Sequence, residues 1–165
     1  MQNYSPTQTV FSLSMYSTLG SGLNGTVDQI ESATLKRITT DLELASVIAD
    51  IGTWSVIWGP AVYQAPASNV ADNVMVVFQA GADATVPGQL VVGIAGTNPY
   101  SAFDWIVEDF LVSSAVPWPY GNPGSLNPKI SLGTAIGLSI LQSLMPGPGL
   151  PGVGTLTSFL HPIVA

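Results

Sequence analysis

The segment from Ile94 to Trp105 brings together residue types that can stabilise a developing negative charge. It leaves an apolar stretch, passes through Gly96 and Thr97, and enters an acidic segment, 101–112, that is predicted as a helix. Gly96 lets the backbone bend without a side chain in the way, Thr97 offers an amide and a hydroxyl at one place, and the helix start adds a positive dipole. Two donors facing one oxyanion would suit acyl transfer, although the same residue types also form ordinary strand exits.

Acyl transfer also needs a nucleophile, which in many hydrolases lies in a Gly-x-Ser-x-Gly turn. That pattern is absent from the 165 residues. Its nearest approximations, 133–137 and 137–141, lack the central serine and the last glycine respectively, so Ser139 is interpreted as a helix residue. The single histidine, His161, stands beside Pro162 and is interpreted as a surface or helix-end residue rather than as a catalytic base.

Other kinds of site find little support in the residue types. One histidine and no cysteine exclude a zinc site, a disulfide and a cysteine nucleophile, and no Gly-rich phosphate loop followed by lysine and serine or threonine occurs. Asp104, Glu108 and Asp109 could form a carboxylate cluster for acid–base work or calcium, but a solvated helix face is the simpler interpretation. We therefore expect neither a cofactor nor a metal.

The composition is that of an acidic chain with few charged residues. A net charge of -7 opposes the binding of nucleic acid. Charged residues make up 8% of the chain and hydrophobic residues 47%, with a mean hydropathy of +0.43, whereas an average soluble domain has about 25% charged residues. No stretch reaches the roughly 20 consecutive apolar residues of a transmembrane helix. We therefore expect an oligomer partner or the remainder of a larger domain to cover part of the surface.

A long helix is predicted in the first third of the chain. Thr26 and Gln29 have the spacing of a capping box, in which each side chain satisfies an amide at the helix start. Apolar residues then recur every three or four positions over 35–51, and Gly52 can end the helix. Acidic residues near the helix start, Asp28 and Glu31, suit the positive end of its dipole.

Three segments are rich in β-branched or aromatic residues and are bounded by turn residues, which predicts strands at 54–63, 74–79 and 90–95. The last two are continuous apolar runs, as is typical of strands covered on both faces. Further helices are expected at 132–144 and from Thr155 onward. These elements predict an α/β fold with a mostly parallel sheet flanked by helices.

The residues around Thr97 also follow one another in a characteristic order. Gly96-Thr97 comes after an apolar strand and is followed by Ser101, by Asp104-Trp105 and by the acidic pair Glu108-Asp109. This order is similar to the oxyanion region of the class 3 lipase family. The resemblance implies an α/β-hydrolase fold, of which this chain would be the amino-terminal part. One departure is Ala95, which stands where many members of the family have arginine.

The resemblance implies a role for each matched residue. Thr97 would supply the amide of the oxyanion hole and also its hydroxyl. Asp104 and Trp105 would brace the loop, and Gly96 and Ser101 would support the turn.

Two segments rich in proline, glycine and apolar residues, 116–124 and 146–152, are expected to be exposed loops. We expect one of them to border the entrance for the substrate. Trp118, which stands between two prolines in the first loop, could contact an apolar substrate.

The domain boundaries follow from these expectations. Residues 1–25 show no sustained hydrophobic period and are expected to form an irregular amino-terminal arm. We expect 26–165 to be the amino-terminal part of an α/β-hydrolase domain, completed by a carboxy-terminal segment or a second chain that carries the Gly-x-Ser-x-Gly nucleophile.

The resemblance implies that the whole protein is a lipase- or esterase-type serine hydrolase acting on lipids or other apolar esters through an acyl-enzyme. This chain alone would be inactive. The alternative is a non-catalytic binding or assembly module that keeps a hydrolase-like scaffold. Secreted and cytoplasmic locations are both compatible with the sequence, and a lipase-like protein slightly favours the secreted one.

Overall fold

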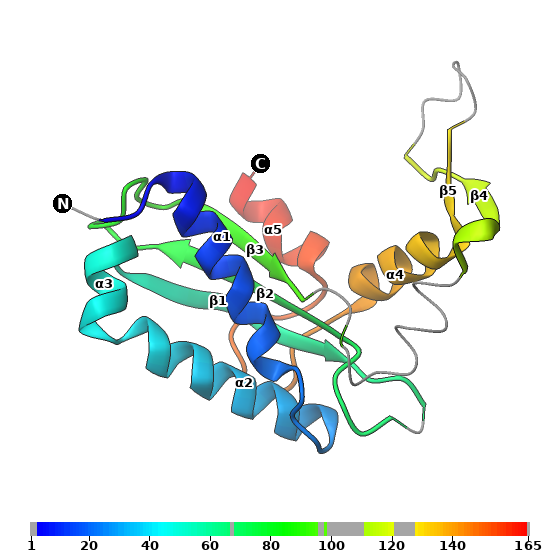
Figure 1. Ribbon diagram of the computed structural model, residues 1–165, viewed down its shortest axis with the longest axis horizontal. Helices are drawn as coiled ribbons and strands as arrows, with labels where there is room; N and C mark the ends of the chain where they lie inside the picture. Colours follow the sequence, from blue (N-terminus) through cyan, green and yellow to red (C-terminus); the bar gives the residue numbers. More distant parts are fainter. Residues whose placement is uncertain (1–2, 67, 96–97, 99–110, 121–127, 165) are drawn as a thin grey trace.

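The computed structural model describes residues 3–66, 68–95, 98, 111–120 and 128–164. A three-stranded sheet lies at the centre of the molecule, with α1 (Pro6–Tyr16) and α2 (Val27–Leu42) over one of its faces and α5 (Leu156–Val164) over the other (Figure 1). Helix α4 (Leu132–Ser143) and a short hairpin extend away from this body. In the part of the chain that the structure describes, no helix is long and apolar enough to cross a membrane.

Helix α1 covers residues 6–16, so the prediction of an irregular arm over residues 1–25 was wrong for this stretch. Ser5 caps α1 through a capping box with Gln8, and Pro6 stands in its first turn. A short 3-10 helix, η1 (Ser17–Gly20), follows. Leu13 of α1 is fully buried against the sheet. Helix α1 is rich in serine and threonine, which hides its apolar period, and its packing on the sheet stabilises it instead.

The predicted long helix consists of two helices, α2 and α3 (Ala45–Ile51). The capping box of Thr26 and Gln29 at the start of α2 is confirmed. Leu44 is extended, and this breaks the helix before α3 begins. Gly52 ends α3 with φ 76°, a left-handed value that favours glycine, as predicted.

The sheet contains β1 (Trp54–Tyr63), β2 (Asn73–Ala80) and β3 (Leu90–Ile94), in the order β1-β2-β3. The positions of all three strands are confirmed, but both pairings are antiparallel. The expectation of a mostly parallel sheet is therefore not met by the described strands. The connections 64–72 and 81–89 are shorter than the dozen or more residues of a parallel crossover, so each strand turns straight back.

Strand β2 is buried on both faces, as its continuous apolar run predicted. Val76 and Phe78 pack against α1 and α2, whereas Met75 and Val77 pack on the opposite side against Trp58 and α5. Strand β3 differs, because only alternate residues are buried.

The carboxy-terminal elements begin with η3 (Leu111–Ser113) and a hairpin of β4 (Ala115–Pro117) and β5 (Lys129–Ser131). Helices α4 and α5 confirm the two predicted helices closely. Between them, residues 144–155, here called the linking segment, cross β1. Pro151 accepts a hydrogen bond from the amide of Gly59 at 2.9 Å, and the carbonyl of Gly154 accepts one from Nε1 of Trp58 at 3.1 Å.

Candidate functional site

The predicted oxyanion turn leaves the end of β3. The proposed donor, Thr97, lies outside the described residues. The proposed supporting residues lie outside them as well, namely Gly96, Ser101, Asp104 and Trp105. The acidic residues Glu108 and Asp109 lie outside them as well. The structure does describe Ala95 and Asn98, which stand on either side of Gly96-Thr97. The site is therefore built from these two anchors.

Ala95 fixes the side of the turn that comes from β3. Its amide donates a hydrogen bond to the carbonyl of Val74 at 2.9 Å, which extends the β2–β3 ladder beyond Ile94. The Ala95 side chain is buried in a small apolar cluster. The other members of this cluster are Ile30, Val62, Ala71 and Val74, with Leu23 and Val27 packed against it.

Asn98 fixes the other side of the turn. Its side chain is only 2% exposed, and Nδ2 donates a hydrogen bond to the carbonyl of Ala71. A buried amide side chain is costly unless it is hydrogen-bonded, so this contact determines where Asn98 can lie. The sequence analysis missed this role, and the sequence carries no signal for it beyond the preference of asparagine for turns.

The loop that receives Asn98 is itself held in place. Asp72, next to Ala71, donates its amide to the carbonyl of Tyr63 at 2.9 Å, and its carboxylate accepts a hydrogen bond from the amide of Ala65. Asn24 and Val70 form an isolated bridge beside it. Hydrogen bonds to Tyr63 and Ala65 and the bridge with Asn24 therefore hold the loop that receives Asn98.

The fold of the chain is similar to that of a solved lipase. The chain superposes on the crystal structure of M37 lipase with a TM-score of 0.79 and 33% sequence identity, and the match covers 98% of this chain and 46% of that one. The chain has a lipase-like fold. It spans about half the length of M37 lipase. No family model and no curated protein matches the chain.

The lipase-like fold includes the amino-terminal helix, because the match extends over nearly the whole chain. The fold relates the chain to a hydrolase of the lipase type. The class 3 family remains a resemblance carried by the residues around Thr97.

Trp118, the candidate substrate-binding residue, belongs to the hairpin beside α4. Its ring meets that of Tyr120 edge to face, with centroids 5.5 Å apart, and its amide donates to Pro128 at 2.8 Å. The Tyr120 hydroxyl in turn accepts a hydrogen bond from Gln142 of α4. Contact between Trp118 and a substrate stays a prediction, as does the role of segments 116–124 and 146–152 at a substrate entrance. The prediction of a loop was wrong for Val116 and Pro117, which belong to β4, and 121–124 lie outside the described residues.

Ser139 and His161 are helix residues, as interpreted from the sequence. Ser139 lies exposed on α4 and His161 lies exposed on α5. Among the described residues, no group of three or more His, Cys, Asp and Glu side chains is placed to hold a metal ion.

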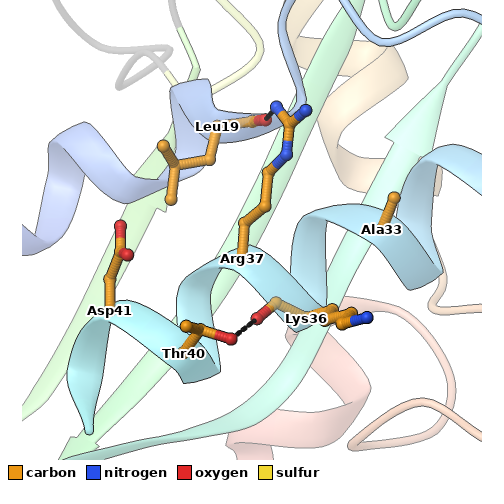
Figure 2. A pocket seen from close by; sticks show the side chains of 6 residues that line it. All are labelled: Leu19, Ala33, Lys36, Arg37, Thr40 and Asp41. Carbon is orange, nitrogen blue, oxygen red and sulfur yellow. Dashed lines mark hydrogen bonds between the residues drawn. The ribbon is translucent and has the colours of Figure 1, made fainter. Parts of the chain in front are cut away.

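A groove of about 580 Å³ lies between η1 and α2. Arg37 reaches across from α2 and donates to the carbonyl of Leu19 at 2.8 Å, while Lys36 extends in a different direction (Figure 2). Two of the three basic residues of the chain thus line one groove, but they do not converge on a common point. Among the described residues, its lining contains neither serine nor histidine, so it offers no serine–histidine pair for ester hydrolysis. The lining residues are Leu19, Ala33, Lys36, Arg37, Thr40 and Asp41.

Proposed function

We propose that this chain is the oxyanion-stabilising part of a serine carboxylic-ester hydrolase of the lipase or esterase type, acting on lipids or other apolar esters. The observation that carries the proposal is the pair of buried anchors, Ala95 and Asn98, on either side of Gly96-Thr97 in a lipase-like fold. The order of residues after Thr97, which resembles that of class 3 lipases, supports it further.

In the proposed reaction, a serine from outside this chain attacks the ester carbonyl. The carbonyl oxygen becomes an oxyanion, which accepts hydrogen bonds from the amide and the hydroxyl of Thr97. Loss of the alcohol leaves an acyl-serine, and water then releases the acid and restores the serine. One such donor is worth about 3 to 4 kcal/mol of transition-state stabilisation in comparable sites.

The nucleophile would come from a segment or second chain with a Gly-x-Ser-x-Gly motif. The exposed face of β3 supports such a partner. Ile94 pairs with Met75 and Val92 pairs with Val77, so all four side chains share one face of the sheet. Met75 and Val77 are buried, yet Val92 and Ile94 are 37% and 46% exposed. A further segment lying on β3 would extend the apolar core over these two residues.

The proposal is tested by labelling with a fluorophosphonate, which reacts covalently with activated serines. We expect the complete protein to be labelled on one serine outside residues 1–165 and to hydrolyse apolar esters. The isolated chain should do neither. Labelling of Ser139 would show that the nucleophile lies within this chain, and an unlabelled complete protein would favour the non-catalytic binding or assembly module. The absence of the nucleophile motif from the chain is what keeps that second function in consideration.

A further inference from the structure

Glu31 is a carboxylate buried inside the molecule. It lies in the second turn of α2 and is only 1% exposed. The sequence suggests an acidic residue near the helix dipole, but the side chain points inward instead. A buried carboxylate is costly unless its oxygens accept hydrogen bonds, so the partners of Glu31 show what it does.

Each oxygen of Glu31 accepts a hydrogen bond from a different segment. Oε1 accepts the amide of Val62 in β1 at 3.1 Å, and Oε2 accepts the amide of Gly147 in the linking segment at 3.1 Å. One side chain therefore joins α2, β1 and the linking segment. A Cβ at position 147 would lie 2.5 Å from Oε2, so a larger residue there would force the Glu31 carboxylate to shift.

The rest of the linking segment is held farther along by Trp58 and Gly59, through Gly154 and Pro151. Glu31 contacts its beginning, close to the buried Leu144. Among the described hydrogen bonds, the one from the amide of Gly147 to Glu31 connects α2 with the linking segment. The contact of Glu31 with Gly147 and Val62 is here called the joint.

This joint lies at the end of the sheet from which the candidate oxyanion turn leaves. Val62, which donates to Glu31, pairs with Val74 in β2, and the carbonyl of Val74 accepts the amide of Ala95. Ile30, the neighbour of Glu31 in α2, packs in the same cluster as Val62, Val74 and Ala95. Glu31 is thus connected to the anchor of the turn by the hydrogen bond from Val62, the cross-strand pairing of Val62 with Val74, and the hydrogen bond from Ala95 to Val74.

We propose that Glu31 is a positioning residue, whose carboxylate fastens the linking segment to the end of β1 that packs with Ala95, the residue before the candidate oxyanion turn. The inference rests on the proposed function for its link to catalysis. The joint itself rests on the geometry alone.

The electrostatics of Glu31 give the joint a pH dependence. Burial raises the pKa of Glu31 above its ordinary value, the hydrogen bonds from Val62 and Gly147 oppose this, and the nearby Asp28 adds to the rise. The elements packed on Glu31 present Asp28 and Ser32 from α2, and backbone amides from β1 and the linking segment.

The direction of the effect follows from this raised pKa. The Glu31 carboxylate binds a proton more readily when the joint is closed than when the joint is open and the carboxylate is hydrated. The closed state is therefore favoured in acid and becomes less favoured as the pH rises from the ordinary pKa of glutamate through the raised one. The linking segment should open more readily above this range.

Amide hydrogen exchange in the protein that contains this chain tests the joint. Glu31→Gln keeps only one acceptor oxygen and turns an NH₂ group toward the other amide. We expect exchange at Val62 or Gly147 to rise at least tenfold, because an amide loses its partner. Glu43→Gln, the same change at an exposed position of the α2 C-cap, should leave both rates unchanged. Equal protection in both variants would overturn the proposal.

The pH profile separates positioning from a general loss of structure. In the wild type, exchange at Gly147, corrected for its intrinsic rate, should rise with pH across the titration of Glu31, and in Glu31→Gln the profile should be flat. If the variant does not fold, the titration of the wild-type Glu31 carboxyl by NMR decides. The pH midpoint of the carboxyl titration should lie above the ordinary value for glutamate, and the signal of the Gly147 amide should change with the same midpoint. A titration that is seen at the carboxyl but not at the Gly147 amide would overturn the joint.

The link to catalysis is tested in the complete enzyme. Glu31→Gln should lower kcat at least tenfold while leaving KM unchanged, and an unchanged kcat would overturn the positioning role. If the wild-type enzyme hydrolyses no ester, the proposed function fails, and amide exchange still decides whether the joint exists.

Discussion

The side chain of Asn98 donates a hydrogen bond to the carbonyl of Ala71 and so attaches the candidate oxyanion turn to the loop between β1 and β2. The two residues are far apart in sequence but share a buried site at one end of the sheet. Ala95, on the other side of the turn, packs in a cluster with the same Ala71. Both anchors therefore depend on one loop.

Asn98→Ala should lower the free energy of unfolding by about 1 to 3 kcal/mol, because it leaves the buried Ala71 carbonyl without its partner. Denaturant titration of the complete protein measures this loss. Asn24→Ala is the control, because the side chain of Asn24 is exposed and donates a long hydrogen bond to the carbonyl of Gly22 at 3.4 Å, while its backbone bridge to Val70 survives the substitution. Equal losses in the two variants would show that the Asn98 contact contributes nothing special to the fold.

Val92→Thr combined with Ile94→Thr should reduce the binding of an apolar dye by the isolated chain. These two apolar side chains are exposed, whereas their cross-strand partners Val77 and Met75 are buried. Val86→Thr, at an exposed position in the turn before β3, is the control. In the complete protein the wild-type chain should bind little dye. Equal dye binding by the complete protein and the isolated chain would mean that no partner covers β3.

Elements with a strong local signal could be predicted from the sequence. Thr26 and Gln29 form their capping box because its interactions span only three residues. Strands β1 to β3 were located because β-branched and aromatic runs between turn residues need little context. The residues around Thr97 resemble those of a lipase, and the lipase-like fold agrees with that interpretation.

Features that depend on distant contacts were not predicted. A continuous apolar run indicates burial on both faces, but it does not distinguish a parallel from an antiparallel pairing, so β2 was placed in the wrong kind of sheet. Glu31 was interpreted only as an acidic residue that suits the helix dipole, since its partners Val62 and Gly147 are remote in sequence. Asn98 was missed for the same reason.

Thr53→Val should raise the pKa of Asp83 toward its ordinary value. The Thr53 hydroxyl donates to the Asp83 carboxylate and is the main cause of its lowered pKa, and the Thr53 amide adds to the effect. A lowered pKa in the folded state stabilises the protein above the unfolded pKa, and this stability is lost as the pH falls through the folded value. The variant should therefore lose less stability on acidification.

Denaturant titrations of the Thr53→Val variant near neutral pH and in acid measure this difference. Thr40→Val is the control, because the Thr40 hydroxyl donates to the Lys36 carbonyl rather than to a carboxylate. If the variant loses as much unfolding free energy on acidification as the wild type does, Asp83 does not contribute to the loss of stability in acid.

Gly147→Ala should destabilise the protein by about 1 to 3 kcal/mol, because the added methyl group would crowd the carboxylate of Glu31 in a packed site. A double-mutant cycle with Glu31→Ala isolates the contact. In the Glu31→Ala background the cost of Gly147→Ala should fall, since the clashing oxygen is gone. Strictly additive losses would show that the two positions do not touch.

Thr97→Val in the complete enzyme should lower kcat by roughly a hundredfold or more with little change in KM, because the change keeps the shape of the side chain but deletes the hydroxyl donor. The Thr97 amide survives the substitution, so a residual rate should remain. Asp104→Ala should also reduce activity, but through disorder of the loop and with a loss of stability. Thr97→Val should leave the unfolding free energy almost unchanged, which separates the two effects. An unaltered kcat in a correctly folded Thr97→Val enzyme would exclude the hydroxyl from the mechanism and leave the backbone amide as the donor.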